Sequence, residues 1–228
     1  MAKPTRYTPQ LIEEYTKRGY WEDTTFSKIC DQNARDYPSK EALVDSRTRL
    51  TWAQVKQQMD RLALGFLELG IKRDEMIVVQ LPNCVELWLL RVACEKAGLL
   101  CLPVVRTLRH REMEHILSYT EAVGLVIPWQ FRGFDYYEMI QEMRPALPNL
   151  KHLFVVGDRA PEGAIALEEV LQEPLEGVYS PDSLNGTRCQ ATEFSLVLLT
   201  TGTTGSPKFL ENPICARLTY TRYLDRIC

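Results

Sequence analysis

The stretch MIVVQLPNCVELWLLRVACEKAGLLCLPVV, residues 76–105, decides the fold class. Its opening residues, 76–81, form a short apolar run that is typical of a β-strand. We expect a helix over 84–97, with Asn83 as its cap, and a second strand over 99–105. Two strands joined by a helix within about 30 residues make a βαβ unit, in which the strands are parallel.

The alternation of strands and helices continues toward the carboxyl terminus. Further elements are expected at 109–119 (helix), 123–127 (strand), 135–143 (helix) and 152–156 (strand). This order predicts an α/β fold, with a mostly parallel sheet that helices cover on both faces.

Two segments outside this alternation have signatures of their own. The stretch 50–70 has one apolar stripe at helical spacing, a capping box made by Thr51 and Gln54, and Gly70 to end the helix. Residues 157–192 are rich in Gly, Pro, Glu and Ser with weak periodicity, so they predict a surface excursion with one short helix, near 167–171.

The chemistry is concentrated where the apolar run 194–199 leads directly into Thr200-Thr-Gly-Thr-Thr-Gly-Ser-Pro-Lys208. Glycines let a backbone turn tightly, and its amide groups can then form a nest for an anion. Hydroxyl groups add hydrogen-bond donors, and the lysine adds a full positive charge. We therefore predict a polyphosphate site. Its candidate residues are Thr200, Thr201, Gly202, Thr203, Thr204, Gly205 and Lys208.

Residue spacing excludes several other functional motifs. A Walker A loop has lysine directly after its last glycine, whereas Ser206 and Pro207 intervene here and Phe209 follows the lysine. His110 and His115 are five residues apart and lack the H-E-x-x-H pattern, so no metal site is predicted. Neither a G-x-G-x-x-G dinucleotide fingerprint nor a G-x-S-x-G elbow is present.

The motif T-T-G-T-T-G-S-P-K resembles the phosphate-loop signature of the adenylate-forming superfamily, which contains acyl- and aryl-CoA ligases. Upstream segments are similar as well: Gly19-Tyr-Trp21 with Thr25-Phe26, Leu50-Thr-Trp52, Val78-Val-Gln-Leu-Pro-Asn83 and the strand Gly98 to Pro103. The run Gly133-Phe-Asp-Tyr136 resembles the aryl-acid branch, of the 2,3-dihydroxybenzoate–AMP ligase kind.

The resemblance implies a reaction. In this family a carboxylate attacks the α-phosphorus of ATP, giving an acyl-adenylate and pyrophosphate, and a thiol such as coenzyme A then accepts the acyl group. Lys208 would be the catalytic residue, acting with the loop on the β- and γ-phosphates, while Mg²⁺ neutralises the remaining charge. The implied partner is a small carboxylic acid.

The resemblance also implies that family parts are missing. The chain has no Y-G-x-T-E segment for the adenine and no T-G-D aspartate for the ribose, and the C-terminal lid domain is absent. Residues 1–228 are thus expected to be the first part of the large N-terminal AMP-binding domain, inactive alone. A helix that begins near Asn212 runs to the end without a stop signal. The alternative is a non-catalytic module that binds nucleotide, self-associates, or docks on the missing remainder.

Composition and charge indicate which partners and which cellular compartment fit the sequence. A net charge of -3 and a pI near 5.7 give no support for nucleic-acid binding. Seven dispersed cysteines without C-x-x-C spacing, and an N-terminus without an apolar signal region, predict reduced thiols in a cytoplasmic protein. No apolar run approaches the roughly 18 residues that a membrane span needs.

Overall fold

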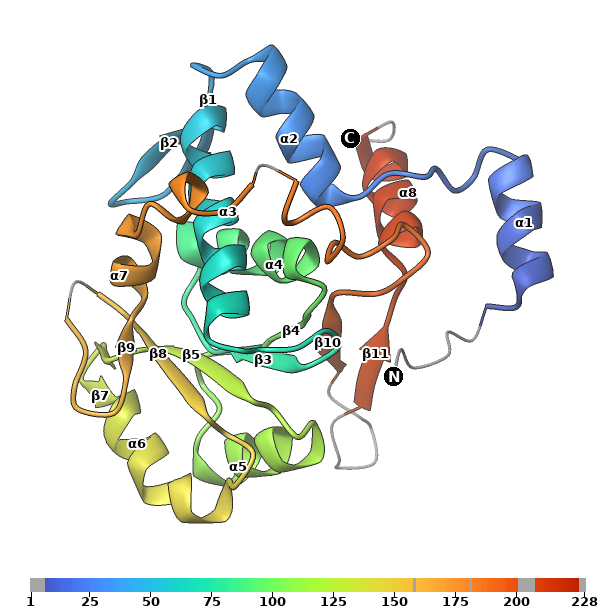
Figure 1. The fold of residues 1–228 in the computed structure, drawn as a ribbon. Helices are drawn as coiled ribbons and strands as arrows, with labels where there is room; N and C mark the ends of the chain where they lie inside the picture. The colour runs from blue at the N-terminus through green and yellow to red at the C-terminus, as the bar shows by residue number, and fades with distance from the viewer. Residues whose placement is uncertain (1–6, 158, 181, 201–207, 226–228) are drawn as a thin grey trace.

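The structure is a computed structural model that describes residues 7–157, 159–180, 182–200 and 208–225 (Figure 1). Its centre is a five-stranded sheet in which every neighbouring pair is parallel. The strands, in spatial order, are β4 (Leu100–Pro103), β3 (Met76–Val79), β5 (Gly124–Pro128), β8 (His152–Val156) and β9 (Ile165–Ala166). The first of these in the chain therefore lies between the second and the third, which is a doubly wound order.

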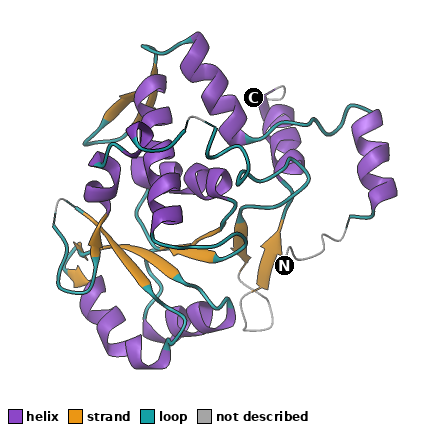
Figure 2. Ribbon diagram, in the orientation of Figure 1, coloured by secondary structure: helices purple, strands orange, loops and turns teal. Residues whose placement is uncertain are grey.

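Helices cover both faces of this sheet (Figures 1 and 2). On one face lie α3 (Trp52–Glu68), α4 (Val85–Ala97) and α7 (Leu167–Gln172), and on the other α5 (His110–Tyr119) and α6 (Tyr136–Met143). Alternate residues of β3 point into separate cores: Ile77 and Val79 into one, Met76 and Val78 into the other. The predicted α/β fold, with a parallel sheet between two helical layers, is confirmed.

Several elements were not predicted. The first part of the chain forms α1 (Pro9–Lys17), α2 (Phe26–Asp36) and an antiparallel pair of strands, β1 (Glu41–Val44) and β2 (Arg49–Thr51). A small hairpin of β6 (Gln130–Phe131) and β7 (Phe134–Asp135) precedes α6, and single 3-10 turns lie at Arg144–Ala146 and Leu175–Gly177. Of the last elements, β10 (Val197–Thr200) and α8 (Ile214–Asp225) correspond to the apolar run at 194–199 and to the helix expected from Asn212, whereas β11 (Lys208–Glu211) was not predicted.

Helix boundaries confirm most of the predicted caps. The side chains of Thr51 and Gln54 form the predicted capping box at the start of α3. Gly70 and Gly98 follow α3 and α4 with φ angles of 76° and 73°, in the left-handed region that favours glycine.

The predicted cap of α4 by Asn83 is wrong. Cys84 is the N-cap residue, and its side chain makes no capping hydrogen bond. The amide of Val85 instead donates to Oδ2 of Asp45, at 3.0 Å. A carboxylate from the turn between β1 and β2 thus takes the role that was expected of a neighbouring side chain.

The segment 157–192 contributes more than the surface excursion and short helix that its composition predicts. It supplies β9, the edge strand of the sheet, and then α7 at the predicted position. Leu167 and Leu175 are buried in the core under α3. Isolated leucines in a polar segment therefore anchor it to the domain.

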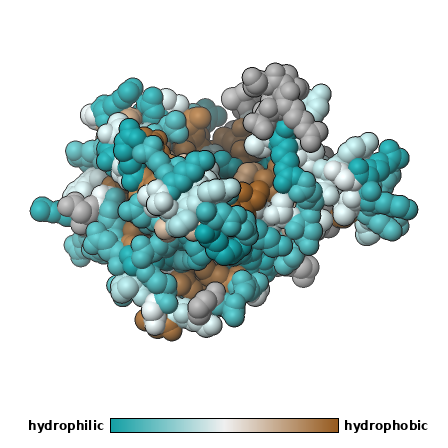
Figure 3. Space-filling view, turned by 90° about the horizontal axis from the view of Figure 1, so that it is seen from above, coloured by the Kyte–Doolittle hydropathy of each residue, from teal (hydrophilic) through white to brown (hydrophobic). Residues whose placement is uncertain are grey.

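Hydrophilic residues cover most of the face seen from above, with hydrophobic residues showing between them (Figure 3). No helix among the described residues is long and apolar enough to cross a membrane.

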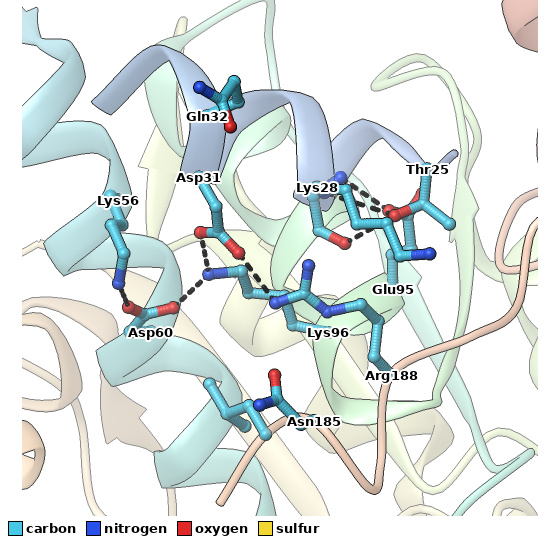
Figure 4. A network of polar contacts seen from close by, with 12 residues as sticks. Thr25, Lys28, Asp31, Gln32, Lys56, Asp60, Glu95, Lys96, Asn185 and Arg188 are labelled. Atoms are coloured by element: carbon cyan, nitrogen blue, oxygen red, sulfur yellow. Dashed lines mark hydrogen bonds and ion pairs between the residues drawn. The ribbon is translucent and has the colours of Figure 1, made fainter. Parts of the chain in front are cut away.

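A buried polar network ties α2, α3 and α4 to a loop far along the chain (Figure 4). The Lys96 side chain is 1% exposed, and its ammonium group donates to Asp31 Oδ1 at 2.7 Å and also contacts the carboxylate of Asp60. Arg188 donates to the second oxygen of Asp31 at 2.7 Å. Because each charged group has an oppositely charged partner, the free-energy cost of burying these charges is offset.

Replacing Lys96 by Ala should lower the free energy of unfolding by about 3 kcal/mol, because Asp31 and Asp60 would stay buried without their ammonium partner. Lys56→Ala is the matched control: Lys56 also pairs with Asp60, but its side chain is 40% exposed. That change should cost less than about 1 kcal/mol. Urea unfolding of both variants measures the difference, and equal losses would contradict the role given to Lys96.

The network also predicts how stability depends on pH. Burial by itself raises the pKa of Asp31, but the charge of Lys96 and hydrogen bonds from Lys96 and Arg188 outweigh burial and hold that pKa below its ordinary 3.8. A lowered pKa in the folded state stabilises the fold above the ordinary pKa, and this stabilisation is lost as the pH falls through the folded value.

Asp31→Asn should therefore remove part of the acid sensitivity of the urea midpoint, measured from about pH 6 to about pH 2. Asp36→Asn, at an exposed position of the same helix, is the control that should retain it. An Asp31→Asn variant with the full acid dependence of the parent would refute the assignment.

Candidate functional site

The candidate site is built on a hairpin beside the edge of the parallel sheet. Strands β10 and β11 pair in antiparallel register, and Thr200 faces Lys208 at the last pair before the connecting loop. The residue before β10, Leu196, forms a parallel bridge with Cys101 of β4, and the Cys101 amide donates to the Ser195 carbonyl at 2.7 Å. The hairpin thus continues from the edge of the sheet at β4.

Two of the predicted site residues belong to the described part of the chain, and the structure brings them together. The hydroxyl of Thr200 donates to the backbone carbonyl of Lys208 at 3.3 Å. Both residues are exposed. The other predicted residues lie outside the described residues: Thr201, Gly202, Thr203, Thr204 and Gly205. Their assignment to a phosphate site stays a prediction.

The cation of Lys208 is uncompensated within the described ranges, since no carboxylate there lies within ion-pairing distance of it. Its neighbour Phe209 stacks on Tyr119, at the end of α5, with ring centroids 4.8 Å apart and planes 12° from parallel. This contact holds the start of β11 against α5.

A cavity of about 1060 Å³ opens between the hairpin and the main sheet. Its walls include Thr200 and Lys208 from the hairpin, Tyr119 from α5, and the first residues of two strands, Met76 and Leu100. Its volume lies just above the range of about 300 to 1,000 Å³ that is usual for small-molecule sites. Its lining carries charge of both signs, with two lysines, Lys151 and Lys208, and four acidic residues, Asp74, Glu75, Glu121 and Glu211.

The doubly wound order also points to another location, the carboxyl ends of β3 and β5, where such sheets usually bind ligands. Gln80 follows β3 there and is fully buried. Its Nε2 donates to the carbonyl of Leu108 at 3.0 Å and less closely to that of Val105, whereas Oε1 has no hydrogen-bond partner among the described residues. The cavity beside Lys208 reaches the opposite ends of the strands, so it is separate from this crevice.

Sequence reasoning missed the residues that complete the cavity wall. Tyr119 ends α5, which follows β4, whereas Lys151 directly precedes β8, and no local pattern marks either residue. Phe209 directly follows the predicted lysine, so its position beside the motif was the available signal. Within the described part of the chain, no group of three or more His, Cys, Asp or Glu residues could hold a metal ion.

The fold and the hairpin define a doubly wound α/β protein in which a Thr- and Gly-rich sequence connects β10 to β11. Comparison of the sequence with models of known protein families identifies its family. The chain belongs to the family of AMP-binding enzymes, whose model matches residues 30–210. The resemblance noted in the sequence is thereby confirmed.

Individual proteins similar to this chain are consistent with this family assignment. The chain is 31% identical over 213 residues to 2-hydroxy-7-methoxy-5-methyl-1-naphthoate–CoA ligase of Streptomyces carzinostaticus, covering 91% of this chain and 38% of that protein. It is 30% identical over 208 residues to 2,3-dihydroxybenzoate-AMP ligase of Bacillus subtilis, covering 90% and 36%. The apo structure of MbtA from Mycobacterium smegmatis superposes with a TM-score of 0.78 at 25% identity, covering 96% and 38%. The chain therefore spans less than two fifths of each of these proteins.

Proposed function

We propose that this chain is part of an ATP-dependent ligase that converts a carboxylic acid to its acyl-adenylate. The observation that carries the proposal is the motif Thr200 to Lys208, which leads from one strand of a hairpin to the other in a chain of the AMP-binding family. The exposed ammonium group of Lys208, without a carboxylate partner among the described residues, supports a role in binding phosphate.

In the proposed reaction, an oxygen of the acid attacks the α-phosphorus of ATP, and the bond from that phosphorus to the bridging oxygen of pyrophosphate breaks. Negative charge then builds up on the leaving pyrophosphate. Lys208 would offset that charge, and Thr200 with the residues that follow it would hold the phosphates by hydrogen bonds. Such positioning and charge stabilisation are the main contributions that a protein makes to phosphoryl and nucleotidyl transfer.

Mg²⁺ would arrive with ATP, bound to the phosphate oxygens, and its positive charge would add to that of Lys208. Coenzyme A is proposed as the acceptor of the acyl group, because one relative is named a CoA ligase. A carrier-protein thiol is the alternative acceptor, since another relative is named a salicyl-S-ArCP synthetase.

The acid is proposed to be aromatic. The named substrates of the relatives above are a hydroxynaphthoate and a dihydroxybenzoate, and further relatives act by name on salicylate. A medium-chain acyl-CoA ligase of mouse is also similar, at 26% identity, so an aliphatic acid is the competing substrate class.

A second candidate is a non-catalytic module that binds nucleotide or docks on a partner. Binding of Mg·ATP by a chain that exchanges no pyrophosphate with any acid would favour this candidate.

The role of Lys208 can be tested by binding, which requires no turnover. Lys208→Ala should weaken the affinity of the chain for Mg·ATP by about tenfold or more, because a charge-assisted contact to phosphate is lost. Lys151→Ala removes another exposed lysine from the same cavity wall, outside the motif, and should have little effect. Isothermal titration calorimetry measures both, and an unchanged affinity in the Lys208 variant would remove the residue from the site.

Acid-dependent exchange of labelled pyrophosphate into ATP tests the activity itself, with the chain alone and a panel of benzoates and aliphatic acids. We expect no exchange, because a complete ligase needs segments beyond those matched here. Exchange with one class of acid would show that these residues suffice and would identify the substrate class.

A further inference from the structure

An asparagine followed by a glycine, Asn185 and Gly186, lies on the loop that also carries Arg188 (Figure 4). Both residues of the pair are exposed. The pair occurs once in the sequence, because the remaining asparagines precede larger residues: Asn33, Asn83, Asn149 and Asn212. Asparagine is chemically labile, since its side-chain amide can be attacked by the backbone nitrogen of the residue that follows. A glycine in that position hinders the attack least, because it has no side chain.

The backbone of Gly186 is open to this reaction. Apart from its chain neighbours, no described residue has an atom within 4 Å of the position that a Cβ would occupy there. Among the described residues, its amide nitrogen has no hydrogen-bond acceptor. The nitrogen is thus free to lose its proton to solvent, and glycine has the conformational freedom to bring it toward the side chain of Asn185.

The side-chain amide of Asn185 takes part in holding the turn together. Its Nδ2 donates to Oδ1 of Asp182 at 2.7 Å, and the backbone amide of Asn185 donates to the Asp182 carbonyl at 2.9 Å. Replacement of Nδ2 by oxygen would remove the first of these hydrogen bonds. It would also place a second carboxylate beside that of Asp182, so that like charges repel each other where a hydrogen bond had been.

The loop is anchored on both sides of the pair. On one side, Leu184 is 7% exposed and belongs to the core that also contains residues of α3 and α4. On the other side, the hydroxyl of Thr187 donates to the carbonyl of Lys96 at 2.9 Å. Only Asn185 and Gly186 join the two anchors, so a change in the length of this segment displaces at least one of them.

We propose that Asn185 is a site of spontaneous deamidation, and that its conversion loosens this loop from the buried network around Lys96. The nitrogen of Gly186, after losing its proton to solvent, forms a bond with Cγ of Asn185. The bond between Cγ and Nδ2 breaks, and that nitrogen takes up protons from solvent and leaves as ammonium. Water then opens the cyclic imide at either carbonyl, which gives aspartate or isoaspartate. Asparagine and water are thus converted to a carboxylate and ammonium, without an oxidant or a cofactor.

The isoaspartate product changes the loop more than the aspartate product does. Its backbone runs through the former side chain, which adds one carbon atom to the chain between Leu184 and Thr187. The segment then no longer fits both anchors. Arg188, the next residue, would be displaced from Asp31, whose second carboxylate oxygen it contacts at 2.7 Å. The proposal does not depend on the function proposed for this chain.

Mass spectrometry tests the modification. The full chain is kept in mildly alkaline buffer, and samples are digested with trypsin over time; peptide 160–188 contains Asn185 as its one asparagine. We expect this peptide to exchange an NH group for oxygen faster than the peptide with Asn149, which is exposed but precedes Leu150. Gly186→Ala should slow the change by about tenfold or more, because a Cβ hinders the attack. The variant should fold, since the added Cβ has open space and φ lies outside the left-handed region.

Urea unfolding tests the consequence. The modified chain carries an additional negative charge, so anion exchange separates it from the parent, and we expect its unfolding midpoint to be lower. Asn185→Asp reproduces the aspartate product and should lower the midpoint less than isoaspartate does. Adding Asp182→Asn to that variant should recover part of the loss, because the pair of like charges is removed.

The proposal is overturned if Asn185 converts no faster than Asn149, or if Gly186→Ala converts as fast as the parent. It is also overturned if the separated modified chain unfolds at the same urea concentration as the parent. The first and third comparisons use the parent sequence alone, so they decide the matter even if a variant does not fold.

Discussion

The burial of β3 on both faces is the constraint on which the rest of the structure depends. Its four residues alternate between two separate cores, so helices must lie above and below the sheet. The crossover through α4 and the return through α5 satisfy that need, and they place β3 between β4 and β5. The edge at β4 is then free to meet the strand that leads to the hairpin.

Charge within the domain is arranged in two contrasting ways. Around Lys96, each buried charge meets an opposite one, and the result is a fixed junction between three helices and the loop at Arg188. Around Arg91 on α4 and Arg217 on α8, like charges lie close together, with the carboxylate of Glu95 beside them. In the first arrangement opposite charges offset the cost of burial, whereas in the second Glu95 offsets only one of the two positive charges.

Periodicity predicted the main sheet and its helices, because each strand and helix has an apolar face that a single segment displays. It missed β2 and β9, since strands of two or three residues are too short to show a period, and it missed β1, whose four residues are only partly buried. The cap of α4 was assigned wrongly because Asp45, from another part of the chain, supplies the oxygen. Likewise the motif marked Thr200 and Lys208, but Tyr119 and Lys151 reach the same cavity only through the topology of the sheet.

The junction between the hairpin and the sheet has a consequence for local motion. The Cys101 amide donates to the Ser195 carbonyl at the outer edge of β4, beside an isolated bridge rather than a continuous ladder. An isolated bridge can open at a lower free energy than a continuous ladder, because fewer hydrogen bonds are broken. Solvent hydrogen exchange at the Cys101 amide would then report how often the hairpin detaches, separately from the unfolding of the domain.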